Sequence, residues 1–189
     1  PVEPDRAATG RWLLRYLGVR ASAAGDTLIT LVATAPDGPW SGLGEKLSAR
    51  LPGLRGLTLD VTPEPTNAIF AGAERPLWGA ADLAETYGPV TVRLTGAGFG
   101  QVNRDQAAAL YAAAPRAALA PLASGAPTTT VQDLFTGAGA LALTVARTAG
   151  PGGPAILGIE RDAAAVERGS AAAAAQGLEG HCTFVAGDA

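Results

Sequence analysis

The chain has 189 residues, a formal net charge of −3 and 48% hydrophobic residues. That length is enough for one sizeable domain or two small ones, and the charge gives no overall basic field of the kind that marks many nucleic-acid-binding domains. One cysteine and one histidine exclude a disulfide framework, a cysteine-based metal site and a histidine cluster within the chain. No apolar run approaches membrane-spanning length and no signal-peptide pattern opens the sequence, so we expect a cytoplasmic protein with no membrane partner and no metal site.

The first half of the sequence predicts a linker over residues 1–10 and an α+β domain over residues 11–97. The linker is polar and contains proline. The domain contains short segments rich in β-branched residues, separated by Gly and Pro turns, so we expect a mostly antiparallel sheet. The segments predicted as strands are 12–21, 27–35, 57–62, 69–70, 83–87 and 90–95, and residues 41–51 are predicted as a short helix.

Residues 98–127 are predicted to form a loop and a helix that connect this domain to a second one. Glycines surround Phe99 at the start of the segment. Asn103 and Gln106 have the spacing of a capping box, which predicts that a helix begins directly after Asn103. We expect Pro115 to kink or split that helix, because proline removes a backbone donor and clashes with the preceding turn.

The last part of the sequence, residues 128–189, is typical of the N-terminal half of a Rossmann-like α/β domain. An apolar strand leads into Gly137 and Gly139, which allow a sharp turn and a close approach to a ligand. An Ala/Leu/Val-rich helix, a strand ending at Glu160, a second helix and a third strand before Asp188 follow. We therefore expect a nucleoside pocket at the carboxyl edge of a parallel sheet.

The glycine pattern alone fits two kinds of ligand. It also satisfies a dinucleotide fingerprint, in which Glu160 would bind a ribose hydroxyl of NAD. Asp133 precedes the glycine turn, and a pyrophosphate there would meet its carboxylate at short range. S-adenosylmethionine has no phosphate and carries an ammonium and a sulfonium group, so charge favours this methyl donor. In an alternative role, Asp133 is a solvated strand-end residue that only caps a nearby backbone group.

Four segments match the motifs of one enzyme family in order and spacing. Gly98–Asn103 is similar to the signature F-x-Q-x-N, and Asp133–Gly139 is similar to D-L-[FY]-C-G-x-G. Gly158–Glu160 resembles G-[VI]-E, and Val185–Ala189 resembles the ending of the third strand. Together they resemble the RNA (uracil-5-)-methyltransferases, S-adenosylmethionine-dependent class I enzymes that act on ribosomal RNA or tRNA. The first segment is the specific one, since the others occur across S-adenosylmethionine enzymes.

The resemblance implies S-adenosyl-L-methionine as the cofactor and an RNA as the partner. In it, Gln101 and Phe135 would contact the donor, Glu160 would hold the ribose hydroxyls, and Asp188 would lie near the adenine. Phe99 would face the target base or pack beneath it. The implied cofactor-binding set is Gln101, Asp133, Phe135, Gly137, Gly139, Glu160 and Asp188, with Phe99 as a substrate contact.

The implied reaction transfers a methyl group to C5 of a uridine, after a cysteine thiolate adds to C6, and a base then removes the C5 proton. Both groups are expected beyond the equivalent of Ala189, so we expect a fragment that carries the donor site and is inactive alone. We do not expect Cys182 to be the nucleophile, because it begins a strand whose carboxyl end faces the pocket. Thr136, Ala140 and Gly100 depart from the family's usual Cys, polar residue and bulkier residue.

Two functions from other classes stay open at this point. One is an NAD(P)-dependent oxidoreductase that uses the same glycine turn. The other is a non-catalytic RNA-binding module that uses the first α+β domain.

Overall fold

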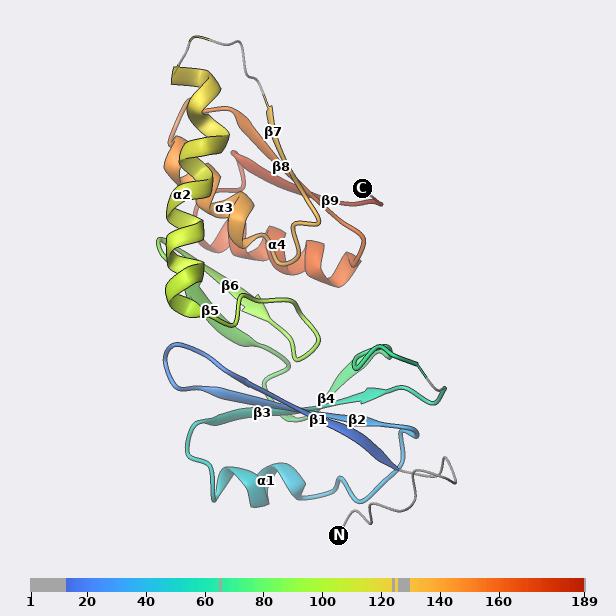
Figure 1. The fold of residues 1–189 in the computed structure, drawn as a ribbon. Coiled ribbons are helices and arrows are strands. Elements are labelled where there is room, and N and C mark those ends of the chain that lie inside the picture. Colours follow the sequence, from blue (N-terminus) through green and yellow to red (C-terminus); the bar gives the residue numbers. More distant parts are fainter. Residues whose placement is uncertain (1–12, 65, 124, 126–129, 189) are drawn as a thin grey trace. The chain divides into compact units, whose positions relative to one another are not determined.

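The computed structural model describes residues 13–64, 66–123, 125 and 130–188 (Figure 1). The predicted linker over 1–10 lies outside these residues, as do residues 124 and 126–127 of the predicted connecting segment and residues 128–129 of the predicted Rossmann-like segment. The chain divides into two compact units: unit 1 comprises Pro1–Leu83 and Thr95–Ala97, and unit 2 comprises Ala84–Leu94 and Gly98–Ala189.

Unit 1 is a four-stranded mixed sheet with one short helix. Its strands β1 (Leu14–Ala21), β2 (Thr27–Ala33), β3 (Leu54–Val61) and β4 (Glu74–Gly79) lie in that order, and α1 spans Leu43–Ser48. The β1–β2 and β3–β4 pairs are antiparallel, whereas β2 and β3 are parallel because the chain crosses over through α1. The expected mostly antiparallel sheet is therefore present, and side chains such as Leu57 and Leu59 are completely buried in it.

One expectation for unit 1 is wrong, and one strand was not expected. Ile69 and Phe70 form no strand, and the Phe70 ring instead packs on Gly18, where an added Cβ would lie 2.9 Å from the ring. The sequence does not predict β4, because Pro76 lies in its middle and lacks the N–H that a sheet ladder uses. β4 accommodates this proline because it is an edge strand of the sheet.

Unit 2 combines a β-hairpin, a three-stranded parallel sheet and three helices. Its elements are β5 (Leu83–Tyr87, of which Leu83 is grouped with unit 1), β6 (Val90–Leu94), α2 (Arg104–Ala123), β7 (Thr130–Leu134), α3 (Ala140–Ala149), β8 (Ala155–Glu160), α4 (Ala163–Ala175) and β9 (Cys182–Ala186). Strands β7, β8 and β9 are parallel and lie in sequence order, and α3 and α4 pack against them (Figure 1). This confirms the predicted α/β class, with an α+β first part followed by a Rossmann-like second part.

The hairpin of β5 and β6 was expected in the domain over 11–97, but the structure groups residues 84–94 with unit 2. Tyr87, Val92 and Leu94 are buried in the same apolar cluster as α3 and β9. Gln176, at the C-terminus of α4, binds the backbone of β6 twice: its Oε1 accepts from the N–H of Thr91 at 3.0 Å, and its Nε2 donates to the Thr91 carbonyl at 2.9 Å. The hairpin therefore contributes side chains to the core that carries the predicted pocket.

Helix α2 begins where the capping pattern predicts. The Oδ1 atom of Asn103 accepts a hydrogen bond from the N–H of Gln106 at 3.1 Å, as an N-cap residue does. The helix runs without interruption through Pro115 and Pro121, so it is not split at Pro115, and the kink expected there as the alternative stays a prediction. Within the part of the chain that the structure describes, no helix has the length and apolar character needed to span a membrane.

Phe184 of β9 packs against glycines from three other elements. An added Cβ would lie 2.5 Å from its ring at Gly139, 2.6 Å at Gly158 and 3.0 Å at Gly169. These glycines belong to the start of α3, to β8 and to α4. The ring thus holds the glycine turn, the sheet and α4 together, and a larger residue at any of the three positions would separate them.

Candidate functional site

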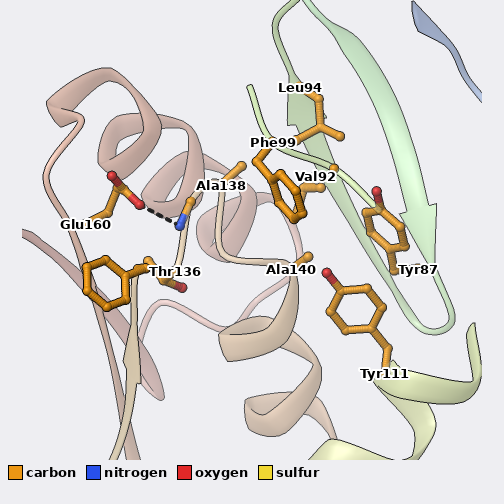
Figure 2. A pocket seen from close by; sticks show the side chains of 12 residues that line it. Tyr87, Val92, Leu94, Phe99, Tyr111, Thr136, Ala138, Ala140 and Glu160 are labelled. Carbon is orange, nitrogen blue, oxygen red and sulfur yellow. Dashed lines mark hydrogen bonds between the residues drawn. The ribbon is translucent and has the colours of Figure 1, made fainter. Parts of the chain in front are cut away.

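A cavity of about 410 Å³ lies in unit 2, where β7 and β8 end (Figure 2). The hairpin, the segment before α2, α2 itself, the turn after β7 and the last residue of β8 all contribute to it. Its lining consists of Tyr87, Val92, Leu94, Phe99, Gly100, Tyr111, Phe135, Thr136, Gly137, Ala138, Ala140 and Glu160. This is the carboxyl edge of the parallel sheet, where the sequence predicts a pocket.

The turn between β7 and α3 has an unusual backbone. Gly137 and Gly139 have φ angles of 58° and 87°, in the left-handed region that glycine adopts easily. Phe135, with φ of 59°, is the one non-glycine in this region among the described residues, and its side chain is 70% exposed. A bulky residue in this conformation is strained, and such strain is found most often at functional sites.

Asp133 joins the end of β7 to the first turn of α3. Its Oδ2 atom accepts from the Thr136 hydroxyl at 2.6 Å and from the N–H of Ala142 at 3.1 Å. Burial raises the pKa of the Asp133 carboxyl above its usual value, while these two hydrogen bonds lower it. Asp133 caps a backbone group, as its alternative role predicts, but it is half-buried rather than solvated and does not line the cavity.

Glu160 is the polar anchor of the cavity. Its Oε2 atom accepts from the N–H of Gly137 at 3.0 Å (Figure 2), and its Oε1 atom accepts from the N–H of Asp162 at 3.0 Å. These bonds fix the orientation of the carboxylate. Each oxygen keeps a further lone pair for a ligand hydroxyl, because a carboxylate oxygen can accept two hydrogen bonds.

Tyrosines from β5 and α2 form an aromatic wall that the sequence does not predict. The rings of Tyr87 and Tyr111 are 4.8 Å apart between centroids and inclined at 43°. Burial raises the pKa of Tyr111 to about 12, with smaller contributions from Tyr87 and from the charge of Asp133, so its hydroxyl is neutral at physiological pH. The alternation of apolar and polar residues over 90–95 predicts a strand, but it does not reveal which apolar core the hairpin packs on.

The predicted site residues fall into two groups. Phe99, Phe135, Gly137 and Glu160 line the cavity. Gln101, Asp133, Gly139 and Asp188 do not: Gln101 directly follows the lining residue Gly100, Gly139 packs against Phe184, and Asp188 is exposed after β9. The ligand contacts assigned to all eight residues stay predictions.

Cys182 is buried, with 3% of its surface exposed. Burial raises the pKa of its thiol to about 12, with a further contribution from the charge of Asp133. It is therefore protonated at physiological pH, as an inert structural cysteine is. Among the described residues, no group of three or more His, Cys, Asp or Glu side chains could hold a metal ion.

The fold is an α/β unit with a cavity at the carboxyl edge of a parallel sheet. No family model matches the chain. A protein named "Uncharacterized RNA methyltransferase" from Lactobacillus johnsonii is 29% identical over 177 residues, which are 93% of this chain and 37% of that protein. A protein of Parasynechococcus marenigrum with the same description is 27% identical over 93% of this chain and 36% of that protein. The chain thus spans little more than a third of the length of these relatives.

Solved structures resemble the fold. The tRNA (uracil-54, C5)-methyltransferase of Pyrococcus abyssi, solved in complex with S-adenosyl-L-homocysteine, has a TM-score of 0.70 at 16% identity. The similarity covers 94% of this chain and 40% of that one. The tRNA m1G37 methyltransferase of M. jannaschii has a TM-score of 0.52 at 14% identity, over 97% of this chain and 50% of that one. At these identities the likeness establishes the fold alone.

Proposed function

We propose that this chain carries the donor site of an S-adenosylmethionine-dependent RNA methyltransferase that modifies C5 of a uridine in ribosomal RNA or tRNA. The observation that carries the proposal is Glu160, a carboxylate held by two backbone N–H groups at the end of β8 and open to the cavity. A ribose offers two adjacent hydroxyls to such a carboxylate. The volume of about 410 Å³ lies within the usual range of about 300–1,000 Å³ for small-molecule sites.

A nicotinamide dinucleotide fits this site less well. Its pyrophosphate would need free N–H groups at the start of α3. The N–H of Gly137 is bonded to Glu160 and the N–H of Ala142 to Asp133, so two carboxylates already occupy this helix end. A bound pyrophosphate would be repelled by both charges, whereas the sulfonium and ammonium of S-adenosylmethionine would not.

The RNA substrate is proposed from two kinds of observation. The relatives with sequence similarity carry the description RNA methyltransferase, and the P. abyssi protein is described as an enzyme of tRNA uracil C5. The segment from Phe99 to Asn103 has the F-x-Q-x-N pattern and begins at the cavity. The thiolate for C6 addition would come from outside this chain, because Cys182 is the only cysteine in it and is buried.

Calorimetric titration with S-adenosylhomocysteine and, separately, NADH tests the donor site. We expect the thioether nucleoside to bind and Glu160→Ala to weaken it at least about tenfold, since hydrogen bonds to a charged group contribute roughly 1.5–3 kcal/mol each. Glu179→Ala, an exposed glutamate outside the cavity, is the matched control. Binding of NADH alone would overturn the proposal, and an unchanged affinity in Glu160→Ala would remove this residue from the site.

A separate assay tests the substrate. The enzyme that contains this chain is incubated with tritiated donor and unmodified RNA, and the RNA is digested to nucleosides. We expect label in 5-methyluridine, and Gln101→Ala is expected to lower this turnover more than it lowers donor affinity. Label in a different nucleoside would reject C5 specificity while leaving the donor site intact.

A further inference from the structure

The cavity has two chemically different sides. Figure 2 shows Glu160 on one side and Tyr87 and Tyr111 on the other, with Ala138 and Phe99 between them. The tyrosine side also includes Val92 and Leu94 of the hairpin. It is therefore an aromatic and apolar wall facing a carboxylate.

The charge on the tyrosine side favours a cation. Among the described residues that line the cavity, none is a lysine or an arginine. Tyr111 is neutral at physiological pH, and the negative charge of Asp133 is close enough to act on it. Electron-rich tyrosine rings and hydroxyl oxygens attract an onium group, and the nearby carboxylate strengthens that attraction.

We propose that the Tyr87–Tyr111 pair recognises the positively charged sulfonium of the donor, so that the site binds S-adenosylmethionine more tightly than its neutral thioether product. This inference rests on the proposed function, because it requires a ribose at Glu160. In the donor, one methylene joins the sulfonium to the ribose, so the charge lies beyond the ribose, away from the carboxylate that holds the hydroxyls. The sulfonium charge is lost on methyl transfer, so the product would bind more weakly than the donor and would be released more easily.

Another occupant of the tyrosine side would be the adenine ring, which could stack on the same side chains. The two arrangements differ in what a tyrosine variant does. Adenine is common to the donor and the product, so loss of stacking would lower the affinity for both ligands equally. Loss of onium recognition would lower the affinity for the donor alone.

The experiment measures dissociation constants of S-adenosylmethionine and S-adenosylhomocysteine by calorimetry for the wild-type chain and three variants. We expect the wild type to prefer the sulfonium by about twofold to thirtyfold, the range that cation–π contacts provide. Tyr111→Leu is expected to remove most of this preference by lowering the affinity for the donor. Its effect on the affinity for the thioether is expected to be less than about twofold. Tyr111→Phe keeps a ring and is expected to retain most of it. Tyr16→Leu, which changes the tyrosine of β1, is the matched control.

Each other result is decisive. Equal weakening of both ligands in Tyr111→Leu would overturn onium recognition in favour of adenine stacking. A wild type that binds both ligands equally would overturn it without any variant, which covers the case in which Tyr111→Leu does not fold. Failure of the wild type to bind either nucleoside would overturn the proposed function as well, so the two failures are distinguishable.

Discussion

At the level of single residues, the hydroxyl of Thr136 stabilises the carboxylate that joins β7 to α3. In the enzyme family that the sequence resembles, a cysteine is usual at the position of Thr136, and its thiol would be only a weak hydrogen-bond donor. The 2.6 Å bond from the Thr136 hydroxyl is one of two hydrogen bonds that the half-buried carboxylate of Asp133 accepts. Without the Thr136 hydroxyl, the Asp133 carboxylate would keep one fewer hydrogen bond, in a buried environment that already raises the pKa of this carboxyl.

Thr136→Val is therefore expected to lower the free energy of unfolding at neutral pH by about 1.5–3 kcal/mol, and Thr136→Ser by much less. The hydrogen bond from Thr136 lowers the pKa of Asp133, so the variant has the higher folded-state pKa. Its deficit is present while Asp133 is ionised and should shrink as pH falls through the folded pKa. Urea denaturation across the acidic range measures this. A deficit that does not change with pH would show that Thr136 acts through packing rather than through the carboxylate.

Cys182 offers a test of the buried-thiol assignment. With a pKa of about 12, the folded thiol is almost entirely protonated at pH 8. The native chain is expected to react with iodoacetamide at least about a hundredfold more slowly than the urea-unfolded chain, because the thiolate is the nucleophile. Mass spectrometry of the alkylated protein over time measures both rates. For the proposed methyltransferase, Cys182→Ser is expected to leave donor binding and methyl transfer unchanged. Fast alkylation of the native thiol would contradict the assignment.

At the level of elements, the packing of Phe184 makes β8 intolerant of a side chain at Gly158. A Cβ there would lie 2.6 Å from the Phe184 ring and 2.9 Å from the Thr136 methyl group. Gly158→Ala is expected to destabilise the chain by about 1–3 kcal/mol, the usual effect of overpacking. Gly180→Ala is the matched control, since nothing lies within 4 Å of a Cβ at that position.

Denaturant midpoints and m-values measure the two glycine variants side by side. Phe184→Leu should relieve part of the clash, so the double variant with Gly158→Ala is expected to be more stable than the sum of the two single effects. Equal midpoints for Gly158→Ala and Gly180→Ala would mean that the Phe184 ring moves away from a Cβ at position 158 with no loss of stability. Gly158 would then not be required for packing.

Much of unit 2 could be predicted from the sequence because local signals agree there. The strand Ala155–Glu160 ends at the predicted Glu160, and the strand Cys182–Ala186 begins at the predicted Cys182. The Asp162 side chain caps α4 by accepting from the N–H of Ala164 at 2.9 Å, and α3 ends directly before Gly150, as expected of a helix followed by glycine. In these segments alternation, capping and glycine positions all indicate the same structure, and no distant residue has to decide between alternatives.

The aromatic wall could not be predicted in the same way because it depends on long-range pairing. The pattern of β5 and β6 indicates a hairpin but not the partner that buries it. That partner is unit 2, through the contacts of Gln176 with Thr91 and of Val92 with the cluster around α3. Once the hairpin is placed there, Tyr87 reaches the cavity and meets Tyr111 from α2. The predicted donor contacts were confined to familiar motifs, which contain neither tyrosine.

At the level of the whole molecule, the two units have separate apolar cores. One cluster contains residues of β2 and β3, and the other contains residues of the hairpin, α3, α4 and the parallel sheet. Every residue that lines the cavity belongs to unit 2. The proposed donor site therefore belongs to unit 2, and variants in unit 1 such as Tyr16→Leu are suitable controls for it.

The three-stranded sheet of unit 2 also has an apolar face that α3 and α4 do not cover. Leu134, Ile159 and Val185 are partners in the register of β7, β8 and β9, so they form one row across the sheet. Leu134 is 49% exposed and Val185 is 40% exposed, whereas Cys182 and Phe184 on β9 are buried. Side chains alternate between the faces of a strand, so this row lies opposite the helices.

An exposed apolar row of this kind favours self-association of the chain at high concentration. We expect sedimentation velocity to show a larger weight-average mass as concentration rises, and Val185→Lys to reduce that increase because a charge in the row opposes burial. Val19→Lys is the matched control, since Val19 is 63% exposed on β1 of unit 1. A chain that stays monomeric at every concentration, or one whose association responds equally to both lysine variants, would show that the row on the β7–β8–β9 sheet is not the surface responsible.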